Sequence, residues 1–119
     1  AIINQDDKNL NKIIYKNDTR KIITFSNKNK KADVYIDNVT FEKQYSKFNL
    51  KFNIPINNIS GSYSYRIKAI GLHNIYNGTA SIIAGLLAGV KNTYIRSALS
   101  NYIGVNVTYT DGSTVSAIS

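Results

Sequence analysis

A ten-residue alternation of apolar and polar side chains is the pattern that most constrains the fold of this chain. Residues 47–56 read KFNLKFNIPI, so every second residue from Phe48 to Ile56 is large and apolar. Successive side chains of a strand point to opposite faces of a sheet, so this period predicts a strand with one face on a core and one in water. Residues 62–71, SYSYRIKAIG, alternate in the same way. The two segments are predicted to form a β-hairpin with a longer loop between them.

Weaker strand patterns surround this hairpin. Residues 20–26 are predicted as a short strand. Residues 32–45 are predicted as another, whose alternation loses its phase near Asn38, where we expect a β-bulge. Near the C-terminus, alternation continues on both sides of Asp111 and Gly112, and an Asp-Gly pair in that position predicts a hairpin.

Residues 79–104, TASIIAGLLAGVKNTYIRSALSNYIG, carry the long helical pattern of the chain. Within residues 80–90 only Ser81 is polar. In the second half, apolar residues recur at three- and four-residue spacing opposite a polar face. Asn77 or Thr79 is suited to cap the start of the helix, and Gly104 is suited to end it.

The predicted fold class is therefore α+β, with an antiparallel sheet of four to six strands. One long helix, about residues 79–103, packs on that sheet and is followed by the C-terminal β-hairpin. A polar N-terminal arm of residues 1–18 precedes a single domain of residues 19–119.

The helix has two interpretations, which differ in what its glycines contact. Gly85 and Gly89 lie four residues apart and create a small-residue face, which suits close packing on a sheet and equally suits helix pairing at a membrane. The segment resembles the Gly- and Ala-rich helices of small cationic bacteriocins. Its apolar part is about half of the roughly 20 residues that span a bilayer. The residues predicted to serve membrane insertion or helix pairing are Ile82, Ile83, Gly85, Leu86, Leu87, Gly89 and Val90.

The net charge of +8 is concentrated near the N-terminus. Such a block of cations attracts polyanions. Lysine outnumbers arginine 12 to 3, which favours diffuse attraction over bidentate recognition of phosphate or bases. The residues predicted to bind an anionic surface are Lys8, Lys12, Lys16, Arg20, Lys21, Lys28, Lys30 and Lys31.

Residue types that carry acid–base or metal chemistry are scarce in the sequence. It contains one histidine (His73), one glutamate (Glu42) and no cysteine, and its aspartates are scattered. General acid–base catalysis draws on histidine or on paired carboxylates, and zinc sites combine several cysteine, histidine or carboxylate ligands. We therefore predict no catalytic residues, no metal, no cofactor and no enzymatic activity.

The start of the chain and its composition bear on its origin. The sequence begins at Ala1 without a methionine, as after removal of a secretory signal peptide, and it is rich in Asn, Lys and Ile. These features predict a secreted protein, extracellular or at the cell surface, of a low-GC Gram-positive bacterium.

The predicted function is binding, through the cationic surface, to an anionic membrane or cell-wall polymer, as in a bacteriocin-like antibacterial protein or membrane-active toxin. Export makes nucleic acid a disfavoured partner. The alternative is a non-enzymatic adhesion or recognition module for a protein receptor or glycan. In that alternative the helix is purely structural and tyrosines such as Tyr63 and Tyr65 make the contacts. An enzyme inhibitor or assembly subunit is a third class, which no sequence feature separates from the second.

Overall fold

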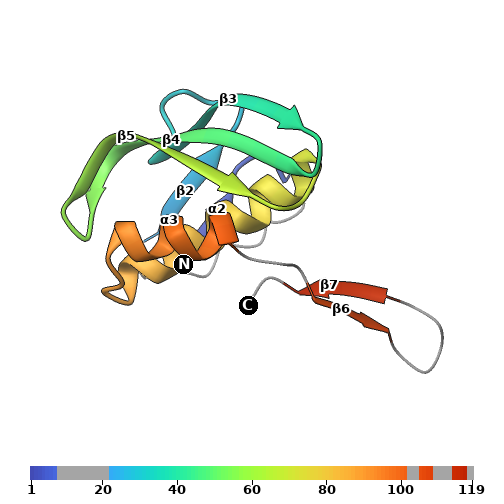
Figure 1. Cartoon of the computed structure of the whole chain (residues 1–119). Coiled ribbons are helices and arrows are strands. Elements are labelled where there is room, and N and C mark those ends of the chain that lie inside the picture. Colours follow the sequence, from blue (N-terminus) through green and yellow to red (C-terminus); the bar gives the residue numbers. More distant parts are fainter. Residues whose placement is uncertain (8–21, 102–104, 109–113, 118–119) are drawn as a thin grey trace.

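The computed structural model describes residues 1–7, 22–101, 105–108 and 114–117, with side chains as far as Ser100. Figure 1 shows the elements in chain order. The strands are β1 (Ile2–Asn4), β2 (Ile23–Ser26), β3 (Val34–Glu42), β4 (Tyr45–Ile56), β5 (Ile59–Ile67), β6 (Val105–Thr108) and β7 (Thr114–Ala117), and the helices are α2 (Leu72–Leu87) and α3 (Asn92–Asn101).

Five strands form one mixed sheet in the order β1-β2-β3-β4-β5. The pairs β1–β2 and β2–β3 are parallel, whereas β3–β4 and β4–β5 are antiparallel. Both helices lie on the same face of this sheet, below it in Figure 1, with α2 against β1 and β4 and α3 against β5. Strands β6 and β7 pair only with each other, in a separate two-stranded sheet.

The predicted α+β fold, an antiparallel sheet with one long helix, is therefore wrong. Strands β1 and β2 are parallel, and two helices replace the single helix of residues 79–103. Gly89 causes the break: it has φ +89°, a left-handed conformation in which helices end. Its N–H donates to the carbonyl of Leu86, and the N–H of Val90 donates to that of Gly85. These two bonds form the Schellman arrangement at the end of α2.

Helix α2 also begins at Leu72, upstream of both predicted caps, Asn77 and Thr79. Its buried residues include Ile75, Thr79, Ile82 and Leu86, a stripe at three- and four-residue spacing that extends upstream into the segment taken as a loop. Asn and Gly are poor helix formers, so the sequence around Ile75 obscured the stripe. Burial against the sheet supplies the stability that local propensity does not.

The central hairpin and the bulge are confirmed. Strands β4 and β5 pair antiparallel, although their turn has only two residues, Asn57 and Asn58, both with positive φ as a type I′ turn requires. The register between β3 and β4 shifts between Asp37 and Thr40, around Asn38 with φ +51°.

The core lies between the sheet and α2. On β4 the alternate residues Phe48, Leu50 and Phe52 are buried, as their period of two predicts. They meet Ile82 and Ile83 of α2, which are fully buried in the same cluster.

Two glycines of the α2 region are expected to respond in opposite ways to alanine. Gly78 is helical, and a Cβ there would meet Ile67 at 3.6 Å, an ordinary contact, so Gly78→Ala should stabilise the fold by up to about 1 kcal/mol through helix propensity. Gly89→Ala should destabilise it by about 1 kcal/mol, because its φ is left-handed. Urea denaturation of both variants measures the difference; equal shifts would contradict the helix end at Gly89.

Candidate functional site

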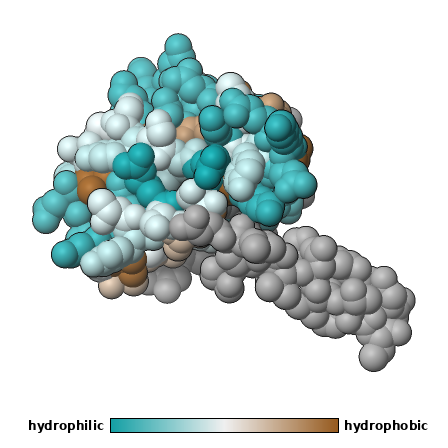
Figure 2. Space-filling model, viewed as in Figure 1, coloured by the Kyte–Doolittle hydropathy of each residue, from teal (hydrophilic) through white to brown (hydrophobic). Residues whose placement is uncertain are grey.

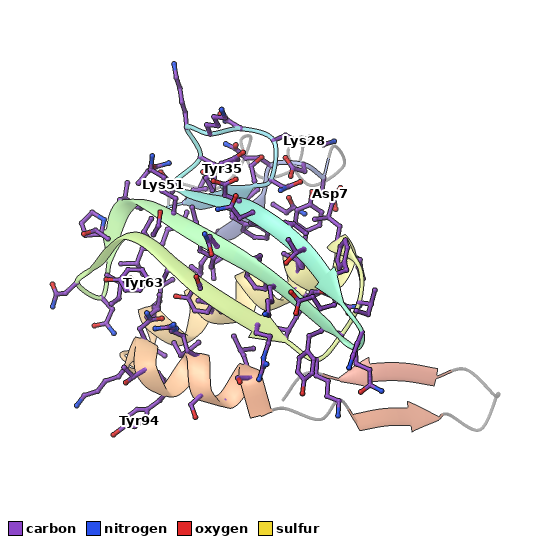
Figure 3. The ribbon with its side chains drawn as sticks, turned by 45° about the horizontal axis from the view of Figure 1, so that its top comes forward. Asp7, Lys28, Tyr35, Lys51, Tyr63 and Tyr94 are labelled. Carbon is purple, nitrogen blue, oxygen red and sulfur yellow. The ribbon has the colours of Figure 1, made fainter. Side chains whose placement is uncertain are left out.

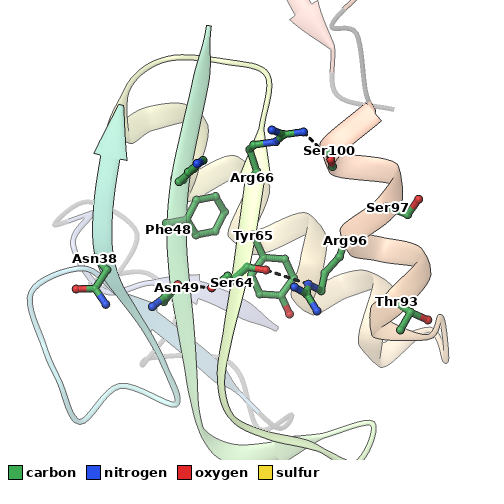
Figure 4. Close-up of a pocket in the computed structure, with 11 residues that line it drawn as sticks. Asn38, Phe48, Asn49, Ser64, Tyr65, Arg66, Thr93, Arg96, Ser97 and Ser100 are labelled. Carbon is green, nitrogen blue, oxygen red and sulfur yellow. Dashed lines mark hydrogen bonds between the residues drawn. The ribbon is translucent and has the colours of Figure 1, made fainter. Parts of the chain in front are cut away.

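A hollow of about 630 Å³ lies where α3 runs along β5 (Figure 4). Its lining takes residues from both faces of β4 and β5 and from the polar side of α3. The lining residues are Asn38, Lys47, Phe48, Asn49, Ser64, Tyr65, Arg66, Thr93, Arg96, Ser97 and Ser100.

Two arginines join the walls of the hollow. Strand β5 is the last strand of its sheet, so backbone groups along its outer side need other partners. Arg96 Nε of α3 donates to the carbonyl of Ser64 at 3.0 Å, and Arg66 of β5 donates through a terminal nitrogen to Ser100 Oγ at 3.1 Å. Figure 4 shows the Arg66 guanidinium beside Ser100 and the Arg96 guanidinium beside Tyr65.

Tyr65 forms the floor of the hollow and anchors the start of α3. Its ring is 3% exposed and stacks on Phe48 at 6.0 Å between centroids. Its hydroxyl donates to Asn92 Oδ1 at 2.6 Å, and burial raises the pKa of Tyr65 to about 12. The phenol is therefore a neutral hydrogen-bond donor at physiological pH.

The charge of the hollow is positive. Its lining includes Lys47, Arg66 and Arg96 and, within the part of the chain that the structure describes, no carboxylate. Lys47 pairs with Glu42 at 3.1 Å, outside the lining. The guanidinium of Arg66 lies 4.3 Å from the centre of the Tyr45 ring, a cation–π contact.

A second polar cluster sits at the carboxyl ends of β1 and β2, around Asp6. The Asp6 carboxylate accepts hydrogen bonds from Ser26 Oγ, from the Asn27 N–H at 2.8 Å and from Tyr76 Oη at 2.7 Å. Burial raises the pKa of Asp6, but these bonds and the charge of Lys28 outweigh burial and lower it overall. The three donors come from β2, from the residue after it and from α2, so the carboxylate ties this end of the sheet to α2.

The three predicted anion-binding residues that the structure describes do not line this hollow. Lys28, Lys30 and Lys31 are exposed in the turn between β2 and β3, and Figure 3 shows Lys28 on that loop, away from α3. The other five residues of that set lie outside the described residues: Lys8, Lys12, Lys16, Arg20 and Lys21. Their role as an anionic-surface site stays a prediction.

The predicted membrane or pairing residues divide between core and surface. Ile82, Ile83 and Leu86 are at most 1% exposed, beneath the sheet. Leu87, Gly89 and Val90 are exposed where α2 ends, and Figure 2 shows hydrophobic residues only as scattered patches on the face in view.

Gly85 lies where the two helices meet. A Cβ at this position would come within 3.1 Å of Ile95 Cδ1, so the glycine allows α3 to approach α2 closely. Of the helices that the structure describes, none has the length and apolar character that crossing a membrane requires.

Sequence reasoning did not identify the hollow. Its cations come from three segments, and Lys47, Arg66 and Arg96 are unremarkable one at a time. The available indication was the spacing of Arg96 and Ser100, four residues apart on the polar face of the amphipathic segment, which places both on one side of a helix.

The mixed sheet with both helices on one face is an arrangement that this chain shares with solved ligase structures. The sequence pattern of the Mur ligase middle domain family matches residues 1–85 of this chain. The chain therefore belongs to the Mur ligase middle domain family.

Curated relatives and solved structures agree with this assignment. The chain is 31% identical to the UDP-N-acetylmuramate–L-alanine ligase of Pelagibacter ubique (strain HTCC1062) over 84% of its own length and 21% of that protein. It is 32% identical to the ligase of the same name from Caldicellulosiruptor bescii, over 88% of the chain and 22% of the relative. The chain thus spans about a fifth of the length of these relatives.

Among solved structures, MurF from Acinetobacter baumannii superposes with a TM-score of 0.68 at 26% identity, over 88% of this chain and 21% of that one. The structure of a UDP-N-acetylmuramoyl-L-alanyl-D-glutamate–2,6-diaminopimelate ligase superposes with a TM-score of 0.70 at 25% identity, over 89% of this chain and 22% of that one.

The family overturns the function predicted from the sequence. The relatives are ligases, so the prediction of a non-enzymatic protein is wrong, as are both the bacteriocin-like toxin and the adhesion module. The names of the relatives refer to a nucleotide-linked sugar, UDP-N-acetylmuramate, and give no support to an anionic membrane, a cell-wall polymer or a protein receptor as partner. The predicted secreted or cell-surface location rested on the start of the sequence at Ala1, and the match to the Mur ligase family overturns it.

Proposed function

We propose that this chain forms part of the middle domain of a ligase that joins an amino acid to UDP-N-acetylmuramate. The observation that carries the proposal is the agreement of three curated relatives, all named UDP-N-acetylmuramate–L-alanine ligase, with 28% to 32% identity over 84% to 88% of the chain. L-Alanine is accordingly the amino acid to test first.

The contribution of this chain is structural support for a site completed by other parts of the ligase. Forming an amide from a carboxylate in water requires the carboxylate to be activated, and we take ATP as the activating substrate. The 119 residues contain no G-x-x-x-x-G-K-[ST] phosphate loop. In the described part of the chain, no three His, Cys, Asp or Glu side chains gather in a group that could hold a metal. The 119 residues alone are therefore expected to show no ligase activity.

A chimera tests the proposal. The matched 100-residue segment of the Pelagibacter ubique ligase is replaced by the corresponding part of this chain, and ADP release is measured with UDP-N-acetylmuramate and L-alanine. We expect activity within about tenfold of the parent, dependent on both substrates. Glycine and L-serine in place of L-alanine test the choice of amino acid.

The control is the same chimera carrying Phe48→Ala, which disrupts the core and should abolish activity. A chimera that folds, as judged by a cooperative thermal transition, but releases no ADP with any of these amino acids would contradict the proposal.

A further inference from the structure

We propose that α3 is a hinged cover on the edge of the sheet, which opens as one unit about Gly89 while the five-stranded sheet and α2 stay folded. The proposal does not depend on the ligase assignment, because it uses only the burial and the contacts of α3. The family match covers residues 1–85 and therefore does not include this helix.

The two helices differ in how much apolar surface they bury. Ile82, Ile83 and Leu86 of α2 are each at most 1% exposed. Among the described side chains of α3, Leu99 is the one buried apolar group, at 7% exposure, and Ile95 is partly buried. Burial of apolar surface is the main favourable contribution to folding, and elements with few buried apolar contacts open at the lowest free energy. We therefore expect α3 to separate from the fold more readily than α2.

Polar contacts supply much of the attachment of α3. Three side-chain hydrogen bonds connect it to β5: Tyr65 to Asn92, Arg96 to Ser64 and Arg66 to Ser100. The last two are exposed to solvent, where water can replace either partner, so their net contribution is small. The first is buried, with 2.6 Å between the Tyr65 hydroxyl and Asn92 Oδ1. The attachment thus rests chiefly on this bond and on the packing of Leu99 and Ile95.

The segment between the helices is suited to act as a hinge. Residues 88–91 are all exposed, so a rotation within them displaces no core side chain. Gly89 has φ +89°, and glycine changes its backbone dihedral angles at a lower steric cost than other residues. The recorded contact of this segment with the sheet is a hydrogen bond of 3.3 Å from Asn57 Nδ2 to the carbonyl of Val90.

Opening of α3 uncovers the edge of β5. This strand is the last of its sheet, and the carbonyl of Ser64 accepts its recorded hydrogen bond from Arg96 of α3 rather than from a neighbouring strand. An edge strand with free backbone groups pairs readily with another extended segment. The closed position of α3 therefore protects this edge, and the open position makes it available for strand pairing.

A rigidly attached α3 makes a different prediction. If α3 is an integral part of the fold, its slowest amides exchange only when the whole domain unfolds. They then exchange at the same rate as the slowest amides of α2 and with the same dependence on urea.

The test is native-state hydrogen exchange of the ¹⁵N-labelled 119-residue chain, followed by NMR at low concentrations of urea. We expect the slowest amides of α3 to exchange at least about tenfold faster than the slowest amides of α2. Their rates should also depend less on urea, because opening α3 exposes less surface than global unfolding does.

Two conservative variants show whether α3 opens separately. Ile36 is fully buried on β3, and Ile36→Val should accelerate exchange of the slowest α2 amides about fivefold. It should leave the α3 rates within about twofold, because Ile36 keeps its contacts when α3 alone opens. Tyr65→Phe should accelerate exchange in both helices about fivefold, because the hydrogen bond to Asn92 is lost in the open state and in the unfolded state alike.

Either of two results would overturn the proposal. Equal acceleration of both helices by Ile36→Val, with an equal urea dependence, would mean that α3 unfolds only together with the sheet. Acceleration of α2 but not of α3 by Tyr65→Phe would mean that the exchange of α3 does not require its release from β5.

Discussion

Replacing Phe48 with Ala is expected to lower the free energy of unfolding by about 4 kcal/mol. Phe48 is 1% exposed on β4, which lies between β3 and β5, and its ring stacks on Tyr65. Strands on both sides fix the backbone, so the space left by the ring cannot collapse and the cavity term adds to the lost transfer energy. Urea denaturation followed by circular dichroism measures the loss.

Phe41→Ala is the matched control, because it removes the same atoms from a side chain that is 51% exposed on β3. We expect a loss of less than about 1 kcal/mol there. Losses of similar size at both positions would mean that the ring of Phe48 is not enclosed by the sheet and α2.

The antiparallel half of the sheet could be predicted because its residues face two different environments. Phe48, Leu50 and Phe52 face the core while Lys47 and Lys51 face water, so the alternation is visible in the sequence. The bulge at Asn38 was visible for the same reason, as an interruption of that alternation.

The parallel half could not be predicted in this way. Residues 20–26 are predicted as a strand, but all four residues of β2 are buried, the polar Thr24 and Ser26 included, so no solvent-facing side indicates which strands lie beside it. Its pairing with β1 and β3 depends on the long connections that parallel strands require. The alternation of residues within one strand does not reveal these connections. The break at Gly89 was missed because a glycine inside an apolar helical pattern suits close packing and a helix end equally well.

The hollow and the family lay beyond sequence reasoning for separate reasons. Arg66 and Arg96 are 30 positions apart, and only the packing of α3 on β5 brings them to one wall. The enzymatic family was missed because this chain, about a fifth of the length of its relatives, carries no phosphate loop and no cluster of catalytic residue types. Net charge and composition were then the strongest remaining features, and they indicate solubility and attraction more than activity.

Asp6→Asn is expected to cost about 3 kcal/mol at pH 7, because hydrogen bonds to a charged group contribute about 1.5 to 3 kcal/mol each and are not fully additive. The carboxylate accepts from Ser26, Asn27 and Tyr76, and an amide would place its own N–H donors against at least one of these. Asp37→Asn is the control: this exposed carboxylate accepts from the Asn38 N–H, and we expect a loss of less than about 1 kcal/mol.

The pH dependence of the Asp6→Asn effect distinguishes the loss of the carboxylate charge from a steric effect of the amide group. The pKa of Asp6 in the folded protein lies below its ordinary value of 3.8, because the three hydrogen bonds and Lys28 outweigh burial. Because the pKa is lower in the folded state, the carboxylate stabilises the fold fully at pH values above its pKa in the unfolded chain. This stabilisation is lost as the pH falls through the pKa of the folded state. Wild type should therefore lose stability below about pH 4 while Asp6→Asn loses less, so that their unfolding free energies converge in acid. A difference that stays constant from pH 7 to pH 3 would show that the amide disrupts the packing of β1, β2 and α2 by its shape alone.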